Sequence, residues 1–499
     1  MGRHDPDARR GLHRELALAL AGAGRGRESA EAWLSAATGA AADERVDCER
    51  RAAEQLLRAG YIDEGLAVAS RVLDVVGVSL PATPARSLAS PLLHRARIVA
   101  RGTSYAVRDV SRCDPALLAR FDACWSVAAG ISVIDPTRAA SLHSLSLLLA
   151  LDLGEPVRLS QALSMEAGFH AMAGPRGRAH ADRMIREARG LAERIDCPDA
   201  LALAEVMTGV AAWGAGRWAL ANDAFGRAFE IIEGRCSGVA WERSTAMIFR
   251  LDARYYLGDW RGLLDELPRM LDDARERGDR YTETLALIRF ECVAGLANDD
   301  PERARRGLRR VADWSHAGFH SVHLVELHET VEVALYEGDG RAAWAALRLR
   351  WIALERSLLL RVQAFRIQMR YLRGRAALAV AASAWSPPER WWYARVALSE
   401  AARCERESTL WGDGLAGLLR AGVASLRGDR AGATEALASS ARLLDAADMR
   451  VHAAVARRVR AALEGDAEAL READEALAGQ GVANVPRMAA MLAPGTWPA

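Results

Sequence analysis

The chain has 499 residues, a formal net charge of +1 and 51% hydrophobic side chains. This length and composition can bury a large core, either in about three globular domains or in one extended repeat array. The charge gives no overall attraction to nucleic acid or to an anionic membrane. All 66 Lys and Arg residues are arginines. Their identity excludes P-loop NTPases, protein kinases and Schiff-base enzymes, because each of these classes needs a lysine amine.

The cysteines and the apolar runs indicate the compartment. The seven cysteines are widely spread and never form a C-x-x-C pair, so they read as small buried side chains in a reducing compartment. The N-terminal apolar stretch at residues 16–23 is too short for a signal peptide. The longest uncharged apolar run, residues 376–385, is about half of the roughly 20 residues that span a bilayer. We expect a cytoplasmic protein that does not cross a membrane.

Helical periodicity begins near residue 11 and continues to about residue 479, with apolar residues at i, i+3/4 and i+7. Prolines interrupt it between residues 77 and 91, and we interpret this segment as a linker before a long helix that ends near residue 101. Later in the chain, Leu347, Trp351, Leu354 and Leu358 form one helical stripe. Alternating strand-like runs are absent, so the sequence predicts an all-α fold.

A recurring turn divides the helices into hairpins. A glycine is followed after five residues by a small residue and after four more by a large apolar one, most clearly at Gly216, where Trp218, Ala221 and Phe225 follow. Glycine permits the turn, the aromatic side chain wedges between the helices, and the small residue lets them approach closely. We therefore expect Trp218 and Phe225 to be buried between paired helices. Similar turns occur at Gly24, Gly60, Gly154, Gly258, Gly338 and Gly428, with a variant at Asn298.

This turn resembles that of a tetratricopeptide repeat, although the spacing of about 40 residues exceeds the roughly 34 of the standard unit. The simplest architecture is an α-α superhelix, a tetratricopeptide-like solenoid of about a dozen degenerate hairpins, because each hairpin buries its apolar face only against its neighbours. We divide the chain into N-terminal hairpins (1–80), a proline-rich linker with long helices (81–150), a repeat array (151–480) and a C-terminal tail (481–499).

Several segments point to a family. These are AAEQLLRAGYIDEGLAV (52–68), CWSVAAGISVIDPTRAA (124–140), GVAWERSTAM (238–247), AGFHSVH (317–323), SLLLRVQ (357–363) and PRMAAMLAPG (486–495). Together they resemble the C-terminal helical region of large bacterial signalling proteins that combine a serine/threonine kinase domain, an AAA-type ATPase module and a repeat array. The resemblance covers about residues 12–495 and implies a regulatory module whose partners are kinase or ATPase modules of the same system.

The kinase and ATPase modules themselves are missing from this sequence, which contains none of the motifs H-R-D, D-F-G or G-x-x-x-x-G-K-[ST]. No catalytic residue is therefore carried over. A stand-alone repeat protein and the downstream part of a longer gene both remain open. The chain ends in a proline-containing tail and not in a basic recognition helix, which argues against DNA binding.

One histidine cluster has a spacing that suits metal. His316, His320, His323 and His328 fall within thirteen residues, and His320, His323 and Glu326 would share a helix face with zinc-ligand spacing. No cysteine or nearby aspartate completes the set. We favour histidines that cap and pack a hairpin turn, and we expect no metal and no cofactor.

Residues 341–375 contain nine arginines and a single acid, Glu355. Arg366, Arg370 and Arg373 share the helix face opposite Phe365, Met369 and Leu372. We expect this arginine face to be exposed, either as a solvated surface or as a docking patch for an acidic partner. Residues 464–475, with six acids and one arginine, form an opposite pole.

These observations predict a non-enzymatic helical-repeat protein that acts in signal transduction by binding a protein partner. Arginine and aromatic side chains dominate binding hot spots, and our candidates are Arg348, Arg366, Arg370, Arg373, Trp213, Trp218, Trp241 and Tyr255. The alternative is a small-molecule sensor that encloses a metabolite among the four aromatic candidates, Trp213, Trp218, Trp241 and Tyr255. An open groove lined with arginine favours the first hypothesis, and a closed apolar pocket favours the second.

Overall fold

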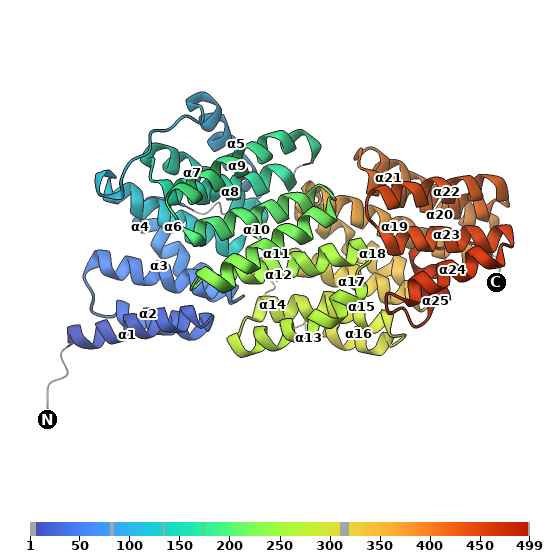
Figure 1. The fold of residues 1–499 in the computed structure, drawn as a ribbon, viewed down its shortest axis with the longest axis horizontal. Coiled ribbons are helices and arrows are strands. Elements are labelled where there is room, and N and C mark those ends of the chain that lie inside the picture. The colour runs from blue at the N-terminus through green and yellow to red at the C-terminus, as the bar shows by residue number, and fades with distance from the viewer. Residues whose placement is uncertain (1–5, 80–83, 133–134, 173, 310–318, 498–499) are drawn as a thin grey trace.

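The computed structural model describes residues 6–79, 84–132, 135–172, 174–309 and 319–497. In these ranges every regular element is helical, which confirms the all-α prediction. Antiparallel helices stack side by side into a superhelix, with the N-terminal hairpins at one end and the C-terminal helices at the other (Figure 1). Within the described ranges, none of the helices combines the length and the apolar character needed to cross a bilayer.

The first part of the array contains α1 (Pro6–Gly22), α2 (Gly26–Ala37), α3 (Ala42–Arg58), α4 (Ile62–Val75), α5 (Pro84–Arg101), α6 (Pro115–Ile131), α7 (Pro136–Leu153), α8 (Pro156–Met172), α9 (Arg178–Arg194), α10 (Pro198–Gly214) and α11 (Trp218–Arg235). Consecutive helices pack mainly on each other, as in α1 with α2, α8 with α9 and α10 with α11. This nearest-neighbour packing is the pattern of a repeat solenoid.

The second part contains α12 (Ala240–Leu257), α13 (Trp260–Arg277), α14 (Arg280–Leu285), α15 (Glu291–Ala297), α16 (Pro301–Leu308), α17 (Ser321–Tyr336), α18 (Gly340–Arg356), α19 (Gln363–Ser383), α20 (Pro387–Glu405), α21 (Leu410–Leu426), α22 (Arg430–Ala446), α23 (Arg450–Glu464), α24 (Ala467–Ala478) and α25 (Val485–Leu492). Helices α14 and α15 are continuous through a π-helical turn, Ala286–Phe290. Such turns are rare and often mark functional or strained positions.

The predicted turn glycines have the backbone that the hairpin requires. All seven of them, from Gly24 to Gly428, adopt positive φ between 69° and 88°, a region that glycine enters without steric cost. In the variant turn, Asp299 takes the left-handed position. A Cβ on Gly216 would also lie 2.4 Å from the ring of Trp411. Trp218 and Phe225 are fully buried, which confirms the prediction for this hairpin.

The linker differs from the prediction. Helix α5 already begins at Pro84, so Pro91 lies inside a helix and not in a linker. An extended stretch follows α5 instead and crosses Gly154, whose carbonyl accepts the N–H of Arg108 at 2.9 Å. A Cβ on Gly154 would lie 2.0 Å from the carbonyl oxygen of Ala106. Gly154 therefore allows both the positive φ of the turn and the close approach of the extended stretch.

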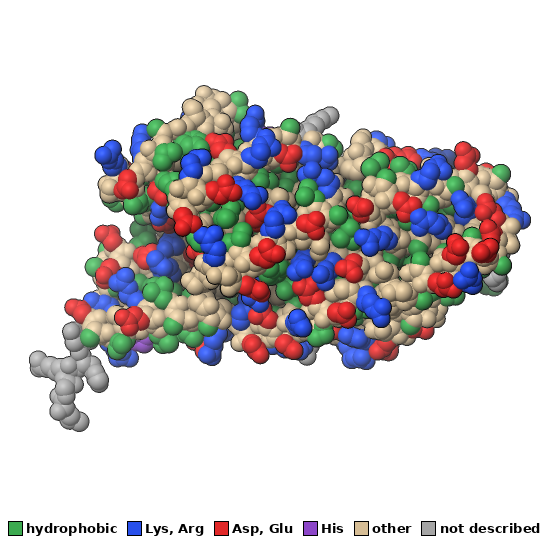
Figure 2. Space-filling model, in the orientation of Figure 1, with side chains coloured by type: hydrophobic (Ala, Val, Ile, Leu, Met, Phe, Trp, Pro, Cys, Tyr) green, Lys and Arg blue, Asp and Glu red, His purple; other side chains and the backbone are tan. Residues whose placement is uncertain are grey.

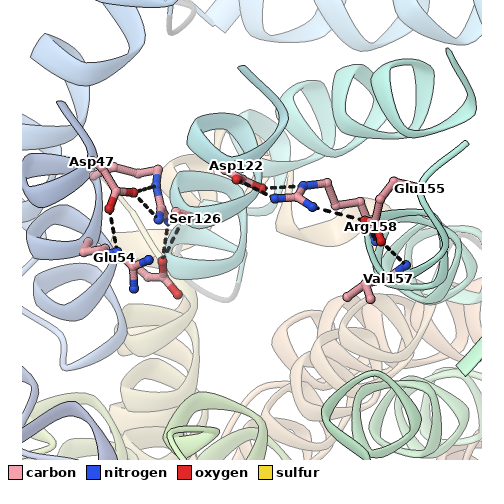
Figure 3. Close-up of polar contacts among 9 residues, drawn as sticks. Asp47, Glu54, Asp122, Ser126, Glu155, Val157 and Arg158 are labelled. Atoms are coloured by element: carbon pink, nitrogen blue, oxygen red, sulfur yellow. Dashed lines mark hydrogen bonds and ion pairs between the residues drawn. The ribbon is translucent and has the colours of Figure 1, made fainter. Parts of the chain in front are cut away.

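Ion pairs join the N-terminal repeats to one another (Figure 3). Arg50 donates to Ser126 at 2.8 Å, and the Ser126 hydroxyl donates to Glu54 at 2.7 Å, which ties α3 to α6. Arg158 donates to both carboxylate oxygens of Asp122, each at 2.8 Å, which ties α6 to α8. Because the Arg158 contact is bidentate, it fixes orientation as well as distance.

Repeats that are distant in the sequence pack against one another in the superhelix. The rings of Trp218 and Trp411 lie 5.4 Å apart, and Tyr256 packs against the same indole. Helix α25 lies in the segment that we predicted to be a C-terminal tail. It packs against α17 and α23, and its Met488 and Leu492 side chains are buried. At these contacts the superhelix therefore has a packed interior in place of an open groove.

Candidate ligand-binding cavity

A cavity of about 460 Å³ lies between the two parts of the array and is lined by α5, α8, α10, α12 and the loop that precedes α19. Most of its wall is apolar, from methionine, aromatic and aliphatic side chains. The polar wall consists of Arg95, Ser132, His170, Thr245 and Arg361. This size, and an apolar wall with a few polar groups, are typical of ligand-binding pockets.

The cavity has a buried floor and an exposed mouth. Met165, Met207 and Val210 line the floor and are buried. Methionine adapts its shape to irregular ligands because its side chain is unbranched and flexible. Leu92, which is 68% exposed, lines the cavity from α5 and must therefore lie at the opening.

One side of the polar wall is electrically balanced. Arg95 donates to Glu166 at 2.9 Å, and the Nε2 of His170 lies 3.1 Å from the same carboxylate oxygen. Burial by itself raises the pKa of Glu166, but the hydrogen bond from His170 and the charge of Arg95 outweigh it and lower that pKa. Glu166 therefore stays ionised behind the wall and compensates the charge of Arg95.

The other polar side is formed by the loop between α18 and α19. Arg361 is exposed and has no ion pair among the described residues. Leu358, which the helical stripe placed in line with Leu354, lies outside α18 and adopts φ +67°. A bulky residue in this region is a backbone outlier, and such strain clusters at ligand-binding and switch segments.

A smaller space of about 80 Å³ continues past Phe249 and Phe365, which line both cavities. A buried charge network borders it. Arg289, on the π-helical turn, donates to Asp252 at 3.0 Å and also to Glu329. The Nδ1 of His328 lies 2.9 Å from Glu329.

The charges of this network satisfy one another. Burial by itself raises the pKa of Glu329, but the charges of Arg289 and His328 lower it to about 2. Arg289 also lies over the ring of Tyr255 at 4.3 Å. Paired buried charges of this kind suit a structural network.

The predicted arginine face is not freely exposed, and this expectation was wrong. Arg366 donates to Glu407 at 2.6 Å, while Arg370 and Arg373 donate to Glu400 at 3.3 and 3.1 Å. Glu400 is only 2% exposed. The compensating acids lie on α20 and just after it, so a local count of charges could not detect them.

The remaining candidate anchors divide into two groups. Arg348 is exposed and makes no ion pair within the described part of the chain. The four aromatic candidates are all buried, which removes them from any outer surface. Trp241 lines the large cavity and Trp213 the small one, whereas Trp218 and Tyr255 pack in the core.

Two of the four clustered histidines form a helix cap. The backbone N–H of His320 donates to Nδ1 of His323 at 3.0 Å at the start of α17. The carboxylate of Glu326 is paired with Arg350. His316 lies outside the described residues. Among the residues that the structure describes, no three metal-ligating side chains come together.

Figure 2 shows acidic and basic side chains interspersed over one face of the molecule, which is consistent with the many ion pairs.

No family model matches the chain, and no curated protein sequence matches it. Among solved structures, the chain is similar to one described as "Crystal Structure of Rap Protein Complexed with Competence and Sporulation Factor", with a TM-score of 0.44 and 11% identity over 88% of this chain and 99% of that chain. The likeness lies in the helical fold alone.

Proposed function

We propose that the protein is a non-enzymatic regulatory module of bacterial signal transduction and that the cavity between α5 and α19 is its binding site. The observation that carries this proposal is the cavity itself, which is about 460 Å³ in volume and mostly apolar. Of the two hypotheses drawn from the sequence, an apolar cavity with a buried floor favours a sensor that encloses a ligand over an open arginine-lined groove.

The position of the cavity suits a regulatory role. Its walls come from α5 and α8 in the first part of the array and from the loop before α19 in the second. A ligand that contacts both parts favours the conformation in which they are close together, and it can shift an equilibrium only by this difference in affinity. The conformational response is then available to a protein partner on the outer surface.

A neutral, environment-sensitive apolar dye tests the site. We expect its fluorescence to rise on addition of the protein, and Gly168→Leu, which fills the floor beside Met207, to abolish the rise. Ala140→Phe, from another wall, gives a second blocking variant. Gly226→Leu is the matched control, because no atom lies within 4 Å of a Cβ at that helical position. Equal dye binding by all four proteins, at equal thermal stability, rules out the cavity.

Exposed apolar side chains on α18, and another on α20, support an additional protein partner, which we propose to be a kinase or ATPase module of the same system. Leu349 and Ile352 are 83% and 62% exposed, and Trp391 on α20 is 57% exposed. Exposed apolar patches commonly mark protein interfaces. The Leu349→Ser/Ile352→Ser double variant should weaken binding to the purified modules, and unchanged binding would remove this surface from the proposal.

The non-enzymatic part of the proposal has its own assay. The purified chain should neither hydrolyse ATP nor phosphorylate protein, because it contains no lysine to position a phosphate. Turnover that follows the protein through gel filtration would contradict this expectation.

A further inference from the structure

We propose that the ligand of this cavity is an amphipathic anion with an apolar chain and one carboxylate, and that Arg361 binds the carboxylate. This inference rests on the proposed function and names the ligand class. The charge of the wall is its first support. Arg95 and Arg361 line the cavity, and no Asp or Glu lies among its described lining residues. Since Glu166 compensates Arg95, Arg361 supplies the unbalanced positive charge.

The placement of polar and apolar groups supports the same class. Arg361 is exposed, so it lies at the mouth, whereas the floor is formed by buried Met165, Met207 and Val210. A ligand with its apolar chain on the floor leaves its charged end at the mouth. There the carboxylate keeps part of its hydration and avoids the cost of a buried, unpaired charge. A guanidinium also matches a carboxylate with two parallel hydrogen bonds.

Hydrogen bonds hold the backbone around Arg361 in place. The N–H of Arg361 donates to the carbonyl of Leu358 at 2.9 Å. Arg366 donates to the carbonyls of Leu360 and Arg361 at 2.7 and 3.2 Å, and it is itself paired with Glu407. The loop is therefore fixed while the Arg361 side chain has no protein partner among the described residues. Such preorganisation reduces the entropy lost on binding.

Two kinds of molecule supply this chemistry. One is a medium-chain acyl carboxylate, and the other is a short apolar peptide with a blocked N-terminus and a free C-terminal carboxylate. Both place one negative charge at the end of an apolar body. A single unpaired arginine suits one carboxylate better than a phosphate ester with two charges.

The test compares charged and neutral forms of the same ligand. Decanoate and its methyl ester, and an N-acetylated five-residue apolar peptide with a free or amidated C-terminus, each displace the neutral dye from the full chain. For at least one pair we expect the carboxylate to bind about tenfold more tightly than its neutral form. Arg361→Gln should remove this difference. Arg356→Gln is the matched control, because Arg356 is also exposed and unpaired in the described structure but does not line the cavity.

The outcomes separate the inference from the proposed function. If the acyl pair alone, the peptide pair alone or both show the charge preference and lose it in Arg361→Gln, the inference holds and the source is identified. If the dye binds but charged and neutral ligands compete equally, or Arg361→Gln keeps the preference, the carboxylate inference is wrong while the cavity remains a binding site. If neither the dye nor any ligand binds, the proposed function fails and the inference fails with it.

Discussion

The indole rings of Trp218, on α11, and Trp411, on α21, lie 5.4 Å apart with their planes at 75°. Both side chains are buried. Repeats that are distant in the sequence therefore share one core, and the superhelix is closed by aromatic packing at this position. Edge-to-face aromatic pairs contribute beyond their buried area, so the contact has a direct consequence for stability.

Trp218→Ala should lower the free energy of unfolding by about 3 to 5 kcal/mol, because it removes a fully buried aromatic side chain and leaves a cavity. Denaturant unfolding of the purified protein measures the change. Trp391→Ala, at a residue that is 57% exposed, serves as the control and should change stability by less than about 0.5 kcal/mol. An unchanged midpoint for Trp218→Ala would show that the hairpin at Gly216 is wrongly assigned.

Arg289→Met should destabilise the protein by about 3 to 5 kcal/mol at pH 7, since it removes the guanidinium that pairs with both Asp252 and Glu329. The pKa of Glu329 is about 2 in the native protein, below its ordinary value of about 4.3. The stability from this group is therefore present above pH 4.3 and is lost as the pH falls toward 2.

The difference between wild type and Arg289→Met should accordingly shrink between pH 5 and pH 2.5 in urea unfolding. Adding Glu329→Gln to Arg289→Met should restore part of the stability, because the uncompensated carboxylate is gone. A pH-independent difference, with no recovery in the double variant, would mean that the pair contributes no charge interaction.

His143 should make stability depend on pH in a milder range. It is buried between Trp125 and Phe169, and burial lowers its pKa to about 4, below the ordinary value of about 6.5. The unfolded chain binds this proton first, so stability is full above pH 6.5 and falls by an amount on the order of 3 kcal/mol down to pH 4. His143→Phe keeps an aromatic ring and should flatten this part of the profile. Parallel profiles for the two proteins would show that His143 does not titrate in this way.

Arg370→Gln/Arg373→Gln should cost about 1 to 3 kcal/mol, because buried Glu400 loses two of its three arginine partners. If the arginine face were exposed, as we expected from the sequence, the same substitutions would leave the stability nearly unchanged. Arg348→Gln, at an exposed arginine without an ion pair in the described structure, is the matched control. Equal thermal midpoints for both variants would show that the Glu400 cluster is not structural.

The sequence determined the helices, the hairpin turns and the residues that pack within one hairpin. Periodicity of 3.6 residues and the need for positive φ at Gly216 or Gly258 are local properties. The burial of Trp218 and Phe225 follows from the same pattern, because the wedge and its groove lie in one hairpin. The sequence could not show whether Trp241 is buried or exposed, since an aromatic residue suits both a core and a binding surface.

The tertiary structure decided which distant repeats meet. The partners of Arg370 and Arg373 come from α20, and the wall of the cavity combines Arg95 of α5 with Arg361 before α19. Neither relationship has a local signal, because the curvature of a solenoid accumulates from small rotations between many repeats. The sequence therefore specified the units, while the sum of their packing angles decided where the superhelix closes and where it leaves space for a ligand.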